Sequence, residues 1–192
     1  SEIQNNEVNE LIFVQNRKKV WIKNNKIKQN ASNILYCNSI QDSIVVECNV
    51  ISENNSQSIG LYFNGSSDCI LYFDKNSVCH NVSSDNLFDF TSSFKNVFIE
   101  NNTIVSNDVL TALLEFHGCP VKLYNNTIVG NVSNGVSNCI AGYYDIVGNV
   151  ILGNSCKLRN GIISRNTEEI RTRWSEVRRI ENNILPSIQW ID

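Results

Sequence analysis

The chain has 192 residues, of which 42% are hydrophobic, and this is enough apolar material for one domain, which we expect to span residues 1–192. The formal net charge of -3 and the absence of a Lys/Arg-rich stripe argue against a nucleic-acid partner. No apolar run approaches the roughly 20 residues of a membrane-spanning helix, so we expect no membrane span.

One sequence phrase recurs seven times, and each copy contains a strand. Its apolar residues are two positions apart, as in Val20 and Ile22 or Val97 and Ile99, and this spacing is typical of a strand rather than a helix. Self-similarity at a nearly constant period indicates a repeat architecture. In chain order, the copies begin at Val20, Ile44, Leu71, Val97, Val121, Asp145 and Arg178.

Two further short strands flank the phrase. The upstream strand is predicted at residues 11–14, 34–37, 61–63, 87–90, 113–116 and 162–163. The downstream strand is predicted at residues 50–51, 104–105, 128–129 and 150–151. Strands this short bury their inward side chains only by stacking on the next copy, about 4.8 Å away. We therefore predict an all-β parallel β-helix of about seven coils over residues 11–185, with three short strands in each coil.

Two columns of asparagine run through the repeat. The first contains Asn25, Asn49, Asn76, Asn102, Asn126, Asn149 and Asn183. The second lies five residues later and contains Asn30, Asn54, Asn81, Asn107, Asn131 and Asn154. Asparagine tolerates the left-handed backbone of a tight corner, and its amide can hydrogen-bond to the equivalent amide one coil away. We predict a structural asparagine ladder along the solenoid.

The phrases NNTIVSN, NNTIVGN and IENNIL resemble the coils of the pectate-lyase-like right-handed parallel β-helix family. The resemblance covers about residues 11–185 and implies a right-handed solenoid. It does not specify an activity, because the family includes polysaccharide lyases, polygalacturonases, phage tailspikes, adhesins and inert spacers. The sequence lacks the Asn-Thr-Asp, Gly-His-Gly and Arg-x-Lys phrases of polygalacturonases, and we identify no catalytic residue.

The strand of the repeated phrase should present two outward columns, one on each side of the inward residue. In pectate-lyase-like enzymes such a face holds calcium and the sugar chain. The resemblance thus implies a calcium site at Glu47, Asp74 and Glu100, and a sugar-binding face at Trp21, Tyr72, Phe98, Lys122 and Tyr124. Alternatively, the carboxylates lie in water and the aromatic side chains cover a flank or a partner surface, and we prefer this interpretation.

The cysteines and histidines predict no metal or catalytic site, whereas the sequons predict sites of glycosylation. The seven cysteines form no C-x-x-C pair and no Cys/His cluster with metal-ligand spacing, which argues against zinc. We assign His80 and His117 to surface or turn packing. N-x-Ser/Thr sequons predict glycosylation in a surface protein, although the repeat alone places all of them except Asn64. They lie at Asn30, Asn54, Asn64, Asn81, Asn101, Asn125 and Asn131.

The long last interval predicts a short amphipathic helix over residues 167–177. Asn166 and Glu169 resemble a capping box, and Ile170, Trp174 and Val177 share one helical face. We expect this helix to brace the solenoid rather than to act as a lid. Neither end of the chain looks capped, so we expect a longer parent chain or self-association, head to tail as in a fibre.

Two functions fit these observations. The first is a non-catalytic structural or adhesive β-helix without a cofactor, located outside the cell or on a cell or virion surface and able to assemble into a fibre. The second is a module that binds an acidic polysaccharide, or cleaves it as a lyase or glycoside hydrolase, along the implied calcium and sugar face. We favour the first and expect the chain not to be an enzyme.

Overall fold

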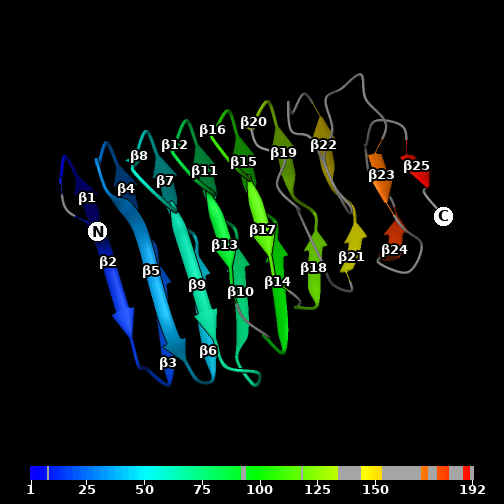
Figure 1. Ribbon diagram of the computed structural model, residues 1–192, viewed down its shortest axis with the longest axis horizontal. Coiled ribbons are helices and arrows are strands. Elements are labelled where there is room, and N and C mark those ends of the chain that lie inside the picture. Colours follow the sequence, from blue (N-terminus) through cyan, green and yellow to red (C-terminus); the bar gives the residue numbers. More distant parts are fainter. Residues whose placement is uncertain are drawn as a thin grey trace.

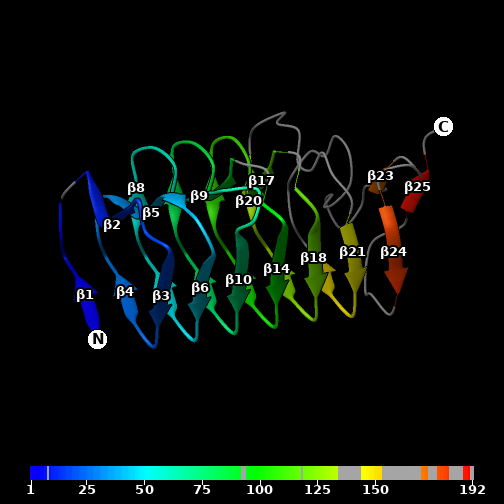
Figure 2. The same cartoon turned by 90° about the horizontal axis from the view of Figure 1, so that it is seen from below.

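The computed structural model describes residues 1–7, 9–91, 94–117, 119–133, 144–152, 170–172, 177–181 and 188–190. These residues form a parallel β-solenoid, in which the chain passes through a series of short strands in each turn (Figure 1). Equivalent strands of successive turns lie side by side along the long axis (Figures 1 and 2). The predicted all-β parallel fold is confirmed. The described residues form about five turns rather than the predicted seven.

Four sheets run along the solenoid. Sheet C contains the strand of the repeated phrase, in β3 (Lys19–Lys23), β6 (Ser43–Glu47), β10 (Ile70–Asp74), β14 (Asn96–Glu100), β18 (Val121–Tyr124), β21 (Tyr144–Val147) and β24 (Val177–Glu181). Sheet A contains the downstream strand, in β1 (Glu2–Gln4), β4 (Lys26–Lys28), β7 (Val50–Ser52), β11 (Ser77–Cys79), β15 (Thr103–Val105), β19 (Thr127–Val129) and β22 (Val150–Leu152). Sheet B contains the upstream strand, in β2 (Glu10–Gln15), β5 (Asn33–Ile40), β9 (Leu61–Gly65), β13 (Phe88–Phe90) and β17 (Leu114–Phe116).

Sheet D was not predicted. It lies between sheets A and B in chain order and contains the two-residue strands β8 (Asn55–Ser56), β12 (Val82–Ser83), β16 (Asp108–Val109) and β20 (Val132–Ser133). Strands of two residues are too short to show an alternation of apolar and polar side chains, which is the pattern that identifies a strand in a sequence. The coils that contain a sheet D strand therefore have four strands rather than the predicted three.

The core consists of the inward side chains of successive turns. On sheet C, Val46 is in register with Phe73, and Phe73 with Ile99. Inside sheet B the rings of Phe63, Phe90 and Phe116 stack, with centroids 5.3 Å and 4.6 Å apart. Each buried large apolar side chain contributes about 1.5–3 kcal/mol to stability. Because equivalent residues of successive turns are in register, the repeat places these apolar side chains next to one another in one continuous core.

The predicted asparagine ladder is confirmed at two corners. Asn49 illustrates the pattern: its Oδ1 accepts from the backbone nitrogen of Asn25 at 2.9 Å and from Asn25 Nδ2 at 3.1 Å. Its own Nδ2 donates to Asn76 Oδ1 at 3.0 Å and to the carbonyl oxygen of Ile22 at 2.8 Å. The first ladder runs from Asn25 to Asn149, and the second from Asn6 to Asn131. Asn154 and Asn183 lie outside the described residues.

The left-handed backbone at each corner lies one residue before the ladder asparagine. Lys75 and His80, for example, have φ values of 53° and 54° and precede Asn76 and Asn81. Residues other than glycine are disfavoured in this conformation by roughly 1–2 kcal/mol. The ladder asparagine itself acts through its side chain, which holds the adjoining turns together.

The helix predicted over residues 167–177 is wrong where the structure describes it. Residues Ile170–Thr172 form strand β23, which pairs in parallel with β25 (Ile188–Trp190). Two of its three residues, Ile170 and Thr172, are β-branched, and backbone pairing with a neighbouring strand outweighs the helical spacing. Residues 167–169 and 173–176 lie outside the described residues. The described part of the chain contains no helix, and so none with the length and apolarity to cross a membrane.

Candidate functional site

The two outward columns predicted on sheet C lie in register. In one column, Val45 is aligned with Tyr72, Tyr72 with Phe98, and Phe98 with Lys122. In the other, Glu47 is aligned with Asp74, Asp74 with Glu100, and Glu100 with Tyr124. Each column is therefore a continuous row along the solenoid axis, and its chemistry depends on what each side chain contacts.

The aromatic side chains of sheet C stack on one another. The rings of Tyr72 and Phe98 lie 5.0 Å apart with an interplanar angle of 7°, and Lys122 Nζ lies 4.8 Å from the centroid of Phe98. Both faces of the Phe98 ring are thereby covered, whereas stacking on a sugar requires an open face. Trp21, with 62% of its surface exposed, is the most open aromatic side chain of this column. The sugar-binding face stays a prediction.

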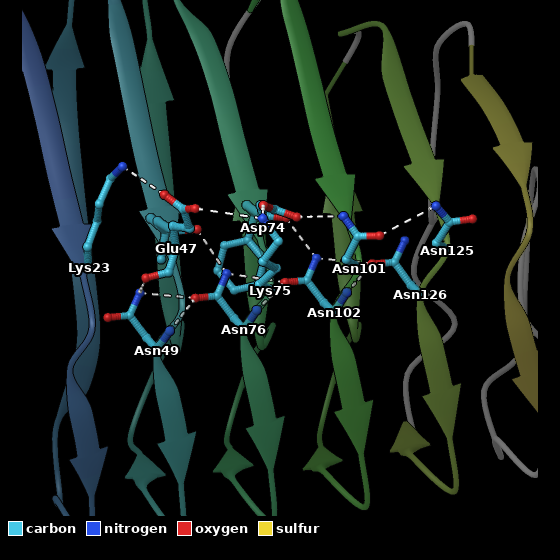
Figure 3. Close-up of polar contacts among 12 residues, drawn as sticks. Lys23, Glu47, Asn49, Asp74, Lys75, Asn76, Asn101, Asn102, Asn125 and Asn126 are labelled. Carbon is cyan, nitrogen blue, oxygen red and sulfur yellow. Dashed lines mark hydrogen bonds and ion pairs between the residues drawn. The ribbon is translucent and has the colours of Figure 1, made fainter.

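The acidic column of sheet C is paired with cations from the protein itself (Figure 3). Glu47 Oε2 lies 2.7 Å from Lys23 Nζ, and Glu47 Oε1 lies 3.9 Å from Lys75 Nζ. Asp74 Oδ2 lies 3.0 Å from Lys75 Nζ, and Asp74 Oδ1 accepts a 2.8 Å hydrogen bond from Asn101 Nδ2. Calcium takes six to eight oxygen ligands, so it would have to displace these lysines. The pairing does not favour calcium here, although the calcium site stays a prediction.

Glu100 completes that acidic column without the same compensation. Burial raises the pKa of its carboxyl above the ordinary value, and the neighbouring Asp74 adds to this effect, while Lys122 acts in the opposite direction. The three predicted calcium ligands thus differ in environment, and only two of them belong to the chain of ion pairs.

A second row of outward side chains, on sheet B, was missed by sequence reasoning. It begins with stacked rings, in which Phe13 and Tyr36 lie 5.4 Å apart and Tyr36 and Tyr62 lie 4.5 Å apart. The register then aligns Tyr62 with Asp89, and Asp89 with Glu115. The row therefore changes from aromatic to acidic between the third and fourth strands of the sheet.

Three ionisable side chains converge at the acidic end of this row. His117 Nε2 lies 3.5 Å from Asp89 Oδ1 and 3.7 Å from Glu115 Oε1. Among the described residues, this is the one group of three His, Cys, Asp or Glu side chains whose ligand atoms all lie within 4.8 Å of one another. Asp89 is buried, Glu115 is partly buried and His117 is exposed, so the cluster is open to solvent on the histidine side.

The buried Asn86 donates hydrogen bonds to both carboxylates and orients them. Its Nδ2 donates to Glu115 Oε2 and, at 3.5 Å, to Asp89 Oδ2. Burial raises the pKa of the Asp89 carboxyl above its ordinary value; His117 opposes this change, and Glu115 adds to it. The cluster therefore consists of two neighbouring acids held by a buried amide and facing an imidazole.

The signal for this cluster was present in the sequence. Sheet B strands were correctly predicted at residues 87–90 and 113–116, so Asp89 and Glu115 are the outward residues of adjacent coils. His117 was assigned to surface or turn packing, but its backbone continues the pairing of β17 by one bridge, which puts its side chain on the side of Glu115. The argument against zinc rested on cysteine spacing, and this cluster contains no cysteine.

The sequons divide by burial. Asn30, Asn54, Asn81 and Asn131 are buried ladder residues, and the amide nitrogen of Asn54, for example, donates to Asn81 Oδ1 at 2.9 Å. Asn101 and Asn125 are exposed, and Asn64 is half-buried. Glycosylation stays a prediction, which the folded chain can accommodate more readily at the last three positions than within the ladder.

All five described cysteines are free thiols. Cys37, Cys69 and Cys119 are buried, and burial raises the pKa of each thiol to about 12. Cys48 is exposed and Cys79 is half-buried. The three buried thiols therefore serve as small apolar core side chains.

No protein-family model, curated protein or solved structure matches the chain. The similarity to the pectate-lyase-like family therefore rests on the repeated phrases alone, whereas the strand pairing shows the parallel β-solenoid fold.

Proposed function

We propose that the protein is a non-catalytic structural or adhesive β-solenoid that acts outside the cell or on a cell or virion surface as a rigid element. One observation carries this proposal: the side chains at the corners and on sheet C make their contacts along the solenoid axis, from one turn to the next. A sugar-binding face instead needs aromatic rings with an open face and polar groups that remain available to the ligand.

Three kinds of contact follow the axis. The asparagine ladders join successive turns from Asn6 to Asn149, the Tyr72 ring stacks on Phe98, and the acidic column alternates with lysine in the order Lys23, Glu47, Lys75 and Asp74. In a solenoid each repeat contacts only its neighbours, so stability is the sum of such interfaces. A row of contacts in each interface resists bending and unwinding, as a structural element requires.

Assembly through further strand pairing fits the same proposal. Parallel strands pair through their backbone groups, and a strand of another copy can pair with an edge strand of the solenoid in the same way. The partner we propose is therefore another solenoid turn.

Electron microscopy of the purified protein at several concentrations tests this proposal, together with sedimentation velocity on the same samples. We expect rods of constant width whose length increases with concentration. A matched variant, Asn76→Ala, removes one rung at the middle of the first ladder and should shorten or weaken the rods. Dispersed monomers at every concentration, bound to a polysaccharide through sheet C, would contradict the proposal.

A second candidate, binding of an acidic polysaccharide, is favoured by Trp21. This side chain is 62% exposed and lies in the column that also contains Lys122. If the second function holds, Trp21→Ala should weaken binding to a polyuronate at least tenfold by calorimetry, with and without calcium. The exposed valine at the start of β7, on sheet A, provides a control, Val50→Ala, which should leave binding unchanged. No binding by the unaltered chain would exclude this candidate.

A further inference from the structure

The cluster on sheet B is brought together by the topology of the solenoid. Asp89 on β13 and Glu115 on β17 are direct partners in the parallel register. His117 lies two residues after Glu115, and residues two apart on an extended chain point to the same side. Two adjoining turns thus contribute side chains to one place on the surface.

The distances suit a small metal ion. In a tetrahedral site with bonds of 2.0–2.1 Å, two ligand atoms lie about 3.4 Å apart. His117 Nε2 lies 3.5 Å from Asp89 Oδ1 and 3.7 Å from Glu115 Oε1. Both distances from the histidine nitrogen are thus within a few tenths of an ångström of the tetrahedral value, and the three ligand atoms all lie within 4.8 Å of one another.

The buried oxygen of Asp89 provides an independent observation. Asp89 is 6% exposed, and its Oδ1 accepts no hydrogen bond, although it is directed toward His117. Buried polar atoms are almost always paired, and a buried carboxylate oxygen that accepts no hydrogen bond requires an explanation. A coordinated cation would satisfy it.

Asn86 holds the carboxylates in the orientation that coordination needs. Its Oδ1 accepts a 3.0 Å hydrogen bond from the backbone nitrogen of Ala112, which fixes the amide. Its Nδ2 then donates to one oxygen of each acid, Asp89 Oδ2 and Glu115 Oε2. The remaining oxygens, Oδ1 and Oε1, are those that face the histidine. Hydrogen bonds of this kind orient the ligands in metal sites.

We propose that Asp89, Glu115 and His117 bind one divalent transition-metal ion of the zinc type. The ligand set decides the class of metal. Imidazole nitrogen suits zinc, cobalt, nickel and copper, whereas calcium and magnesium prefer six or more oxygen ligands. Three protein ligands leave a fourth position, on the side of the half-exposed His117, for water or a group from a partner. The ion joins two turns of the solenoid, as the ladders do at the corners.

Titration of the whole, chelator-treated chain with cobalt(II) tests the proposal, because the visible absorption of bound cobalt(II) depends directly on its coordination geometry. We expect one equivalent of cobalt to bind with the strong absorption of a tetrahedral site and to be displaced by zinc. His117→Gln should weaken binding at least a hundredfold. The histidine at the sheet A corner provides the matched control, and His80→Gln should leave both affinity and spectrum unchanged.

A second variant tests one of the carboxylate ligands. Glu115→Gln keeps the size of the side chain and an oxygen that can accept from Asn86 Nδ2, but it removes the charge of one ligand, so it should weaken cobalt binding at least tenfold. The proposal is overturned if one equivalent of cobalt produces no spectral change up to millimolar concentration. It is also overturned if His117→Gln binds as the unaltered chain does, or if calcium binds in preference to cobalt and zinc.

Discussion

Sheets B and C each present a row of acidic side chains in register, but the two rows differ in what surrounds them. On sheet C, Glu47 and Asp74 are partly exposed and pair with Lys23 and Lys75. On sheet B, Asp89 is buried, and its row contains a histidine in place of the lysines. The same residue type in the same register is thus solvated and neutralised on one sheet, and desolvated on the other. Burial, rather than charge pattern, distinguishes a surface row from a candidate site.

The largest difference between the two regions is expected in thiol reactivity. Cys48 follows Glu47 of sheet C and is exposed, whereas Cys119 lies two residues after His117 and is buried, with its thiol pKa raised to about 12. At pH 8 only about one Cys119 thiol in ten thousand is ionised, and the thiolate is the reactive form. Iodoacetamide should therefore alkylate Cys48 at least about a thousandfold faster than Cys119.

Peptide mass spectrometry after timed alkylation measures both rates in one sample. The same experiment in 6 M guanidinium chloride provides the control, in which the two cysteines should react at similar rates. Rapid alkylation of Cys119 in the folded protein would show that the interior next to the sheet B cluster is open to solvent. It would contradict the expected difference in thiol reactivity between the two regions.

The next difference is in stability, and a pair of asparagines isolates it. Asn86 and Asn101 both donate a side-chain hydrogen bond to a carboxylate, but Asn86 is buried and Asn101 is exposed. Asn86→Ala leaves two carboxylates without their buried donor and should lower the free energy of unfolding by about 3 kcal/mol. Asn101→Gly removes the exposed donor and keeps the left-handed backbone, and it should change the free energy of unfolding by less than about 0.5 kcal/mol.

Urea unfolding with a chelator present measures both variants without a contribution from bound metal. Equal losses for the two variants would contradict the assignment of burial as the deciding factor. A loss at Asn101 larger than that at Asn86 would reverse the comparison and favour sheet C as the ordered site.

The two regions also differ in how far the sequence predicted them. The ladders and the rows of sheet C were predicted because one asparagine and one apolar pair recur at a nearly constant offset. Neighbouring asparagines, such as Asn101 and Asn102, gave no indication of which takes the left-handed backbone, because both tolerate it; the structure assigns it to the first of each pair. The sheet B cluster was missed because Asp89 and Glu115 become neighbours only through the register of two coils. The side of the sheet on which the His117 side chain lies depends on one further backbone bridge after β17, which strand propensities do not predict.

The smallest expected effect is that of an ion pair on sheet C, and its dependence on salt tests the comparison most sharply. Lys23 and Glu47 lie 2.7 Å apart, with side chains 42% and 28% exposed. Lys23→Gln should lower the free energy of unfolding by roughly 0.2–1 kcal/mol at low ionic strength. The loss should largely disappear in 1 M sodium chloride, where the screening length is about 3 Å. The loss in Asn86→Ala should persist there, because it arises from desolvation inside the protein rather than from charges in water. If both losses disappear together in salt, Asp89 is solvated, and sheets B and C are the same kind of surface.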